Sequence, residues 1–351
     1  MLSDLPPLSL PVGVSVGHGT QPLLRSVELA ERIEALGVDF VTVGDSGAET
    51  FGMLGAVASR TTGLGLMSGI ATWSRSPVTM AHAAQTIHNL SDGRYTLGIG
   101  PMPRPWATRF HGLEFDPVVG RMREYLTAVR ACLDATPEHP TDVDGQYFHS
   151  HGFPGHRMTP PRRVPMMMAA TLPAMVRTAV ELTDGPMLNS IHPWDWLTET
   201  APALFDQGLD RAGKDRSEIR VGIMRFCGVD EDRAAAYDHV RRAIAFYFPI
   251  PYLRTLLEPF GYDEELAAGE AAHAAGDPEA MAAAVSDRMV EAIGIAGTPA
   301  EVLARVEEYA EHVDWMQLVG TMNVTGEAAY RQTVRIAELA GAARTAARVP
   351  A

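Results

Sequence analysis

The sequence predicts an α/β fold of the (β/α)8, or TIM, barrel class, and three observations lead to this prediction. Short apolar runs typical of buried strands alternate with segments of helical periodicity along the 351-residue chain. There are eight such runs, near residues 12, 40, 64, 95, 164, 186, 219 and 315, which is the number of strands in a barrel. Gly17 and Gly19 lack the third glycine of a dinucleotide-binding fingerprint, so a doubly wound sheet is the less favoured alternative.

The first half of the chain supplies four strands and four helices. The strand patterns cover 12–16, 40–43, 64–70 and 95–99, and the helical patterns cover 22–37, 50–59, 77–90 and 118–133. Gly37 is a stop signal for the first helix, and Pro77 is typical of a first helical turn. Residues 91–94 indicate a turn, and the proline-dense segment 101–116 is expected to be an irregular loop.

The second half supplies the other four strands and four more helices. The strand patterns cover 164–169, 186–189, 219–229 and 315–319, and the helical patterns cover 173–182, 194–212, 301–312 and 327–340. Residues 136–163 interrupt the alternation and favour an extra loop or small hairpin after the fourth helix. Residues 232–290 are rich in Ala and mostly helical, which predicts a helical insertion late in the chain. We therefore expect a single barrel domain over 1–351 with two insertions.

Composition and charge exclude several classes of protein. With 46% hydrophobic and 21% charged residues, the chain matches an ordinary globular protein and not a disordered one. The net charge of −14 disfavours binding to nucleic acid or anionic lipid, both of which need clustered cations. The apolar runs are too short to cross a bilayer, and no basic segment of a signal peptide precedes them. We expect a cytoplasmic protein whose partner is a small molecule.

In a barrel the chemistry lies at the carboxyl ends of the strands, which singles out several segments. Asp45 follows the second strand, as either a helix cap or an orienting group in a site. Gly69 ends the third strand and marks either a plain turn or a close approach of the backbone to a ligand. Residues 169–175 run into a helix and form either a plain helix start or an anion site at its N-terminus. No lysine is near, so an anion there would rely on N–H groups, Thr171 and an arginine such as Arg177.

Histidines and tryptophans after strands are the remaining candidates. His18 and His192 each follow a strand and suit proton transfer near neutral pH. Trp73 and Trp106 are placed to line an apolar pocket for a planar ring. We expect no metal site, because no cysteine or carboxylate in register joins the three nearest loop histidines, His149, His151 and His156.

Three segments carry more specific patterns. In residues 86–100 a helix ends in Leu-Ser-Asp-Gly-Arg and leads into a Leu-Gly-Ile-Gly strand. Residues 164–189 hold Ala-Ala-Thr-Leu-Pro-Ala-Met and then Asp-Gly-Pro-Met-Leu, and residues 297–302 read Gly-Thr-Pro-Ala-Glu-Val before a helix. Together these segments resemble the bacterial luciferase-like oxidoreductase family over about 12–195 and 290–322.

The resemblance implies a (β/α)8 barrel that binds FMN or the deazaflavin F420 at its mouth. The pair Gly69–Ile70 matches the position where many members have a non-prolyl cis peptide that supports the ring, and 171–175 matches the phosphate segment. The cofactor contacts implied in this way are Gly69, Ile70, Ala71, Thr72, Gly100, Ala170, Thr171, Leu172, Ala174 and Met175.

The chain departs from the family pattern at its catalytic positions. Asp45 matches an acidic residue after the second strand, but Ser46 stands where deazaflavin members often have His. Pro101 follows the fourth strand, where several members have Glu. The expected catalytic residues are therefore Asp45, Ser46 and His18, with His111 as a further candidate proton donor. The expected substrate pocket is apolar and consists of Trp73, Met102, Trp106, Phe110 and His192.

The expected activity is hydride transfer between reduced F420 and an apolar organic substrate. The chain has 28 Arg and a single Lys, which indicates a GC-rich, actinobacterium-like source in which F420 is common. FMN is the alternative cofactor, in a monooxygenase that uses reduced flavin and O2. The sequence is also compatible with a non-catalytic flavin-binding barrel or with an unrelated metal-dependent hydrolase. Because the family commonly dimerises, we expect a homodimer.

Overall fold

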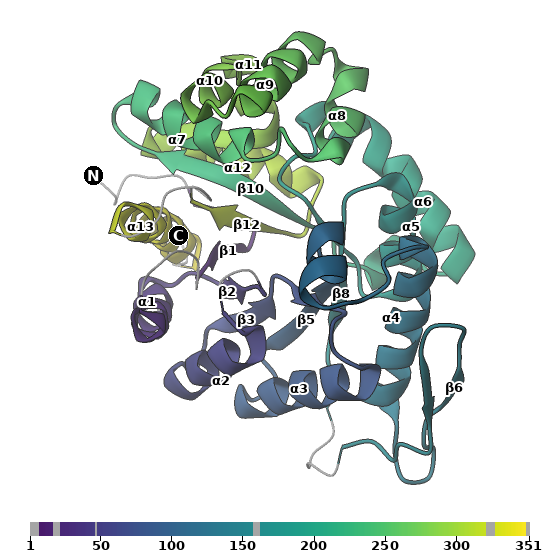
Figure 1. The fold of residues 1–351 in the computed structure, drawn as a ribbon. Helices are drawn as coiled ribbons and strands as arrows, with labels where there is room; N and C mark the ends of the chain where they lie inside the picture. Colours follow the sequence, from purple (N-terminus) through teal and green to yellow (C-terminus); the bar gives the residue numbers. More distant parts are fainter. Residues whose placement is uncertain (1–6, 17–21, 46–47, 157–161, 321–326, 349–351) are drawn as a thin grey trace. The chain divides into compact units, whose positions relative to one another are not determined.

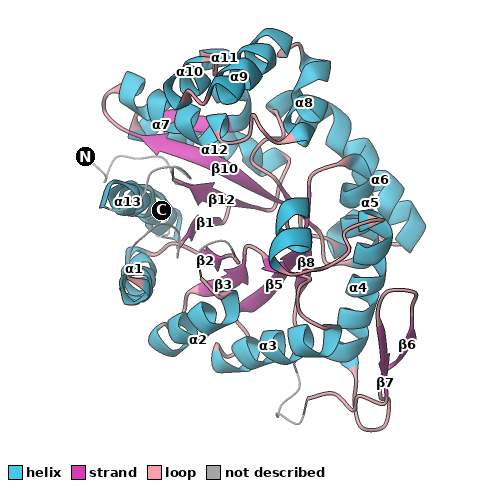
Figure 2. Cartoon of the chain, in the orientation of Figure 1, coloured by secondary structure: helices cyan, strands magenta, loops and turns pink. Residues whose placement is uncertain are grey.

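The computed structural model describes residues 7–16, 22–45, 48–156, 162–320 and 327–348. Contacts divide the chain into two compact units, and Figures 1 and 2 label their helices and strands. The first unit comprises Met1–Val41, Leu188–Asp206 and Arg220–Ala351, and the second comprises Thr42–Met187 and Gln207–Ile219. Strand β2 (Phe40–Val43), strand β9 (Pro186–Leu188) and helix α6 (Ala201–Ala212) have residues in both.

The second unit is built on parallel strands with helices between them. Its strands are β3 (Gly65–Ser68), the short β4 (Ala71–Thr72), β5 (Tyr95–Gly100) and β8 (Met166–Ala170). Strand β5 lies between β3 and β8, with Leu66 opposite Tyr95 and Leu97 opposite Met166, and β4 continues along β5. The helices of this unit are α2 (Thr50–Arg60), α3 (Pro77–Leu90), α4 (Val118–Asp134) and α5 (Pro173–Leu182).

Local sequence signals determine where these helices begin. The Ser76 hydroxyl accepts a hydrogen bond from Thr79 N–H, and Pro77 occupies the first turn of α3. Helix α5 likewise begins at Pro173. Both helices have the predicted bounds, because proline and capping residues are short-range signals that packing does not override.

The predicted hairpin after the fourth helix is confirmed. Strands β6 (Asp142–Asp144) and β7 (His149–His151) pair antiparallel, with Asp142 opposite His151. The predicted irregular loop 101–116 contains one ordered feature, a π-helical turn at Trp106–Phe110.

The first unit also has a parallel sheet. Strand β12 (Trp315–Val319) pairs with both β1 (Val12–Ser15) and β10 (Gly222–Val229), and β10 also pairs with β11 (Gly294–Gly297). Two glycines make room for aromatic rings, since a Cβ on Gly222 would lie 1.9 Å from the ring of Trp315 and one on Gly13 would lie 2.1 Å from that of Phe40. These two rings meet edge to face at 5.5 Å. The helices are α1 (Leu23–Leu36), α7 (Arg233–Ala245), α8 (Pro251–Leu257), α9 (Asp263–Ala275), α10 (Pro278–Ala283), α11 (Asp287–Ile293), α12 (Pro299–Glu308) and α13 (Glu327–Arg348).

The prediction of a helical insertion over 232–290 is confirmed by α7 to α11. Strand β11 was missed, because Gly294-Ile-Ala-Gly is too short and too rich in glycine to stand out as a strand. The predicted strand 64–70 was too long, since β3 ends at Ser68, and so was 219–229, since β10 begins at Gly222. The predicted helix 194–212 is a π-helical turn at Trp196–Thr200 followed by α6.

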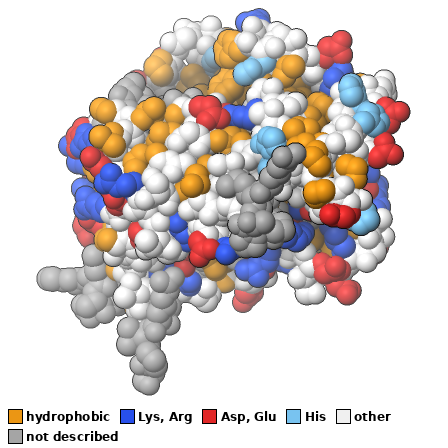
Figure 3. Space-filling model, turned by 90° about the horizontal axis from the view of Figure 1, so that it is seen from below, with side chains coloured by type: hydrophobic (Ala, Val, Ile, Leu, Met, Phe, Trp, Pro, Cys, Tyr) orange, Lys and Arg blue, Asp and Glu red, His pale blue; other side chains and the backbone are white. Residues whose placement is uncertain are grey.

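The surface mixes charges of both signs. On the face drawn in Figure 3, acidic and basic side chains are interspersed with apolar ones and do not form one field of a single sign. Among the described residues, no helix has the length and apolar character needed to span a bilayer.

Candidate functional site

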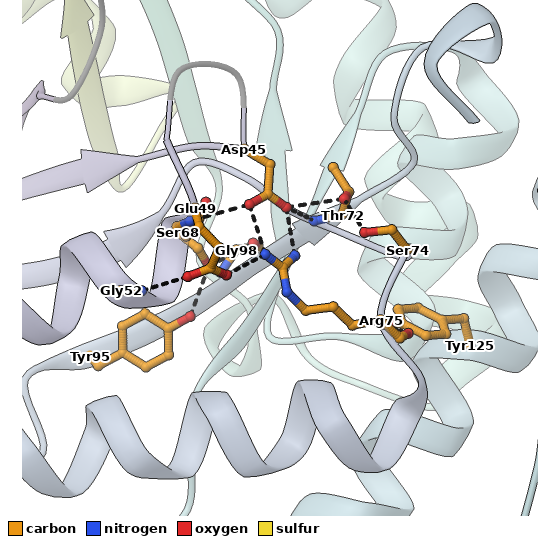
Figure 4. Close-up of polar contacts among 11 residues, drawn as sticks. Asp45, Glu49, Gly52, Ser68, Thr72, Ser74, Arg75, Tyr95, Gly98 and Tyr125 are labelled. Atoms are coloured by element: carbon orange, nitrogen blue, oxygen red, sulfur yellow. Dashed lines mark hydrogen bonds and ion pairs between the residues drawn. The ribbon is translucent and has the colours of Figure 1, made fainter. Parts of the chain in front are cut away.

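Asp45 lies at the centre of a polar cluster in the second unit (Figure 4). It follows β2, and its carboxylate accepts two hydrogen bonds from the guanidinium of Arg75, at 2.6 and 3.0 Å. The carboxylate also accepts from the N–H and the hydroxyl of Thr72, at 2.8 and 3.0 Å. The N–H of Thr50, the first residue of α2, donates to it at 3.3 Å. Asp45 therefore contacts the start of α2, as its interpretation as a helix cap predicts, and also the segment that follows β3.

These contacts determine the charge of Asp45. Burial by itself would raise the pKa of the carboxyl group, whose side chain is only 14% exposed. Hydrogen bonds from Arg75, Thr72 and Thr50 outweigh burial and lower the pKa of Asp45 to about 2. At neutral pH the group is ionised and has no proton to give, so this arrangement suits an orienting role.

Arg75 is fixed by more than Asp45. Its Nη2 also contacts the carboxylate of Glu49 at 2.5 Å, and its guanidinium lies 5.0 Å from the centre of the Phe51 ring. The Tyr125 hydroxyl donates to the carbonyl of Arg75 at 2.8 Å. Burial alone would lower the pKa of Arg75, but Asp45 and Glu49 raise it, so the arginine is permanently charged.

The backbone between β3 and β4 is the second feature of the site. The peptide bond between Gly69 and Ile70 is cis, as the resemblance implies. The N–H of Gly69 donates to the carbonyl of Val43 at 2.7 Å, and the carbonyl of Ile70 accepts from the N–H of Asp45 at 3.0 Å. The Gly69–Ile70 segment is thus tied on both sides to the end of β2.

Glycines let this segment lie directly against its neighbours. A Cβ on Gly44 would lie 2.5 Å from the carbonyl oxygen of Gly69, and one on Gly98 would lie 1.9 Å from that of Ser68. The Ser68 hydroxyl donates to the carbonyl of Gly98 at 2.7 Å and accepts from its N–H at 2.8 Å. Because the Ser68 hydroxyl already donates its only proton to Gly98, the hydroxyl of Tyr95 is the donor in its contact with Ser68, at 2.9 Å. A Cβ on Gly100 would meet the Ile70 side chain at 2.8 Å.

The start of α5 is the third feature. Leu172 is the N-cap residue and makes no side-chain capping hydrogen bond, because its side chain has no acceptor. The first turn of a helix carries N–H groups and partial positive charge that an anion can satisfy. Ala174 is half-buried in this turn, and Ala170 and Met175 on either side are buried. This geometry suits the predicted anionic group.

The predicted substrate residues of the second unit differ in exposure. Phe110 is 72% exposed and stacks on Trp106 with the ring centres 6.1 Å apart, so these two present apolar surface. Trp73 is buried and packs edge to face on Phe115, and Met102 is buried too. Trp73 and Met102 are therefore interior side chains in this structure.

One other predicted residue, His192, lies apart from this cluster. His192 belongs to the first unit, where it is fully buried with its ring centre 4.0 Å from that of Trp196. Its Nδ1 lies 3.0 Å from the carbonyl oxygen of Asn189, so the histidine is part of the packing of that unit. His18 and Ser46 lie outside the described residues.

Sequence reasoning missed Arg75, Glu49 and the Ser68–Gly98 contact. The candidates after the third strand ended at Trp73, and Arg75 lies two residues beyond it. The available signal was a charged residue between a strand end and the Ser-Pro start of the next helix. In the described part of the chain, no three His, Cys, Asp or Glu side chains come together as a metal site.

Comparison with known proteins identifies the family. Residues 8–314 match the luciferase-like monooxygenase family. The chain belongs to this family. A 5,10-methylenetetrahydromethanopterin reductase from Archaeoglobus fulgidus is 31% identical to it over 287 residues, which are 79% of this chain and 83% of the relative.

Solved structures of other oxidoreductases share the fold. The coenzyme F420-dependent tetrahydromethanopterin reductase from Methanopyrus kandleri aligns with a TM-score of 0.76 at 21% identity, covering 95% of this chain and 97% of that one. The oxygenating constituent of 3,6-diketocamphane monooxygenase from Pseudomonas putida, in complex with FMN, aligns with a TM-score of 0.66 at 17% identity, covering 95% and 97%. The predicted (β/α)8 barrel is confirmed, and both reductases and monooxygenases share it.

Proposed function

We propose that this luciferase-like protein is an F420-dependent oxidoreductase that transfers hydride between the deazaflavin and an apolar organic substrate. The observation that carries the proposal is the Gly69–Ile70 segment, held by hydrogen bonds to the end of β2. It lies where the family resemblance implies support for a flavin-type ring. The 31% identity to an archaeal methylenetetrahydromethanopterin reductase favours a reductase.

The residues present fit such a cofactor. The first turn of α5 lacks a side-chain cap, and a phosphate group would supply the missing acceptor. We assign the phosphate to this turn and the ring to the Gly69–Ile70 segment and the end of β5. The proposed contacts are Ala170, Thr171, Leu172, Ala174 and Met175 for the phosphate, and Gly69, Ile70, Ala71, Thr72 and Gly100 for the ring.

The chain's own residues would orient the reactants and supply a proton. When bound, reduced F420 supplies a hydride to a carbonyl or unsaturated carbon. Asp45 positions the Gly69–Ile70 segment through Thr72 and Arg75 and, being ionised, is not the proton source. We assign the proton to His18 or Ser46 on the basis of their sequence positions. Trp106 and Phe110 offer an apolar surface to the substrate, which favours an apolar molecule.

FMN with O2 is the second candidate. A phosphate site at α5 suits the FMN phosphate equally well, and a monooxygenase with FMN shares the fold at a TM-score of 0.66. Oxygen dependence separates the two candidates, because hydride transfer to an organic substrate needs no O2.

A charge reversal at the start of α5 tests the proposal. Ala174→Glu places a carboxylate in the first turn, which suits the helix dipole but repels a phosphate. Ala174→Gln adds the same bulk without the charge. We expect Ala174→Glu to bind F420 at least about tenfold more weakly than Ala174→Gln, a difference of about 1.4 kcal/mol. Fluorescence titration measures the affinity.

Turnover is measured in the same proteins. Under anaerobic conditions, wild type should oxidise reduced F420 with at least one member of a panel of apolar ketones and unsaturated ketones. At low cofactor concentration, Ala174→Glu should not catalyse this reaction. Equal F420 affinity in the two variants would contradict the phosphate assignment. Oxidation of reduced FMN that consumes O2, with no anaerobic reaction of reduced F420, would replace the proposal with the monooxygenase.

A further inference from the structure

A cavity of about 250 Å³ lies between α4, α5 and α6 and shares Ala174 with the site described above. One face of α5 lines it, because Ala174, Thr178 and Glu181 recur at helical spacing. Arg123 of α4 and Arg211 of α6 complete the wall together with Arg177 of α5. The cavity thus contains three guanidinium groups and one carboxylate.

One of the three arginines is neutralised within the cavity. Arg123 forms a paired contact with Glu181, with Nη1 2.7 Å and Nη2 2.5 Å from the two carboxylate oxygens. The hydrogen bond from Arg123 lowers the pKa of Glu181, so this carboxylate stays ionised and its charge is matched. The lining keeps two positive charges, those of Arg177 and Arg211, in a chain whose net charge is −14.

Arg177 has hydrogen-bonding capacity that the described residues do not use. Its Nη1 donates to the Gln207 side chain at 3.4 Å, a long contact to a neutral group. Its Nε is buried and has no hydrogen-bond partner among the described residues. Buried donors are normally satisfied, so this unsatisfied donor destabilises the folded state locally. The long contact to Gln207 leaves the Nη groups of Arg177, a residue that lines the cavity, without a carboxylate partner in the described part of the chain.

We propose that this cavity is a binding site for an oxyanion, a phosphate or a carboxylate group, held by Arg177 and Arg211. Guanidinium groups bind such groups through paired N–H···O contacts, and both arginines line the cavity. Two arginines without a carboxylate partner in the cavity lining are a local excess of positive charge in a chain whose net charge is −14. The site does not depend on the identity of the cofactor.

Two sources of the oxyanion are possible in chemical terms. It is either a free anion or the anionic end of a larger ligand bound at the start of α5, because Ala174 belongs both to that turn and to the cavity wall. Both sources present the same oxyanion, so the experiment separates them by competition between phosphate and the bound cofactor.

Titration of cofactor-free protein with inorganic phosphate tests the site. Calorimetry at constant ionic strength compares wild type with Arg177→Gln and Arg211→Gln, and Arg60→Gln is the control because it removes one exposed charge at the end of α2. We expect saturable binding to wild type and Arg60→Gln, and at least about fivefold weaker binding in the two cavity variants, a difference of about 1 kcal/mol.

The outcomes are distinct from those of the proposed function. No saturable binding, or equal binding in all four proteins, would overturn the site while leaving F420 affinity unaffected. In protein saturated with F420 or FMN, continued phosphate binding would assign the cavity to a free anion. Loss of phosphate binding, with weaker cofactor affinity in Arg177→Gln, would assign it to the anionic end of the cofactor.

Discussion

Asp45 is a residue whose place in the site could be predicted from its position in the sequence, whereas its contacts could not. Its place after the second strand was enough to select it, because barrel sites gather at strand ends. Its charge depends on Arg75, which lies 30 residues away along the chain and reaches it only in the folded state. No local pattern in the sequence reports that pairing, so the sequence alone leaves a helix cap and an orienting role as alternatives.

The Asp45→Asn variant should lose a pH-dependent part of the stability. The folded-state pKa of about 2 lies below the ordinary value of 3.8, so Asp45 contributes stability above about pH 4. That contribution falls as the pH drops through the folded-state pKa. We expect Asp45→Asn to lower the free energy of unfolding by about 2 kcal/mol at pH 7, and by much less near pH 2. Urea unfolding at both pH values measures this.

Glu138→Gln is the matched control, since it removes a carboxylate from an exposed loop position. It should change the free energy of unfolding by less than about 0.5 kcal/mol at either pH. A loss for Asp45→Asn that is the same at pH 7 and near pH 2 would contradict the charge assigned to Asp45.

At the scale of secondary-structure elements, the close contact between β3 and β5 fixes the strand end from which the Gly69–Ile70 segment continues. Gly98→Ala would push a Cβ to within 1.9 Å of the Ser68 carbonyl oxygen, so the two strands would have to separate. We expect a loss of about 1–3 kcal/mol of stability and weaker cofactor binding. Thermal unfolding and a cofactor titration check the two effects.

Gly55→Ala is the control for that substitution. Gly55 lies inside α2, where an added Cβ would be 3.5 Å from the Ile87 side chain, an ordinary contact. Alanine there should stabilise the protein by about 0.5–1 kcal/mol. If Gly98→Ala were as stable as wild type, the close approach of β3 and β5 would be wrong.

Lys214, the single lysine of the chain, caps the C-terminal end of α5. Lys214 Nζ donates to the carbonyls of Val180, Glu181 and Thr183 at 3.2, 3.1 and 3.0 Å. Lys214→Met would leave these carbonyls without that donor and should cost about 1–3 kcal/mol. Lys214→Arg keeps the charge, but its planar fork matches three converging carbonyls less well, so we expect only partial recovery. Urea unfolding of both variants measures this, and an unchanged Lys214→Met would refute the capping role.

Elements with strong local signals were predictable, and those fixed by packing were not. The first residues of α3 and α5 follow from Ser76, Pro77 and Pro173. Strand β11 depends on pairing with β10, and its glycines give no pattern of their own. Strand β3 ends at Ser68 because Gly69 turns to bond with the end of β2, a contact that residue periodicity does not report.

At the scale of the whole molecule, the fold and the family followed from the sequence, and the cofactor did not. Alternating strand and helix patterns predicted the barrel, and the Leu-Ser-Asp-Gly-Arg segment indicated the family. The same barrel serves F420-dependent reductases and FMN monooxygenases, because function depends on site residues and not on the fold. The single domain, the homodimer and the cytoplasmic location stay predictions.

The most direct test of the central proposal is a pair of titrations of cofactor-free protein, one with F420 and one with FMN, each followed by the melting temperature. A ligand at 100 times its dissociation constant stabilises the folded state by about 2.7 kcal/mol. The proposal predicts a large rise in melting temperature with F420 and a small one with FMN. A rise with FMN alone would contradict F420 dependence, and no rise with either would contradict the cofactor site itself.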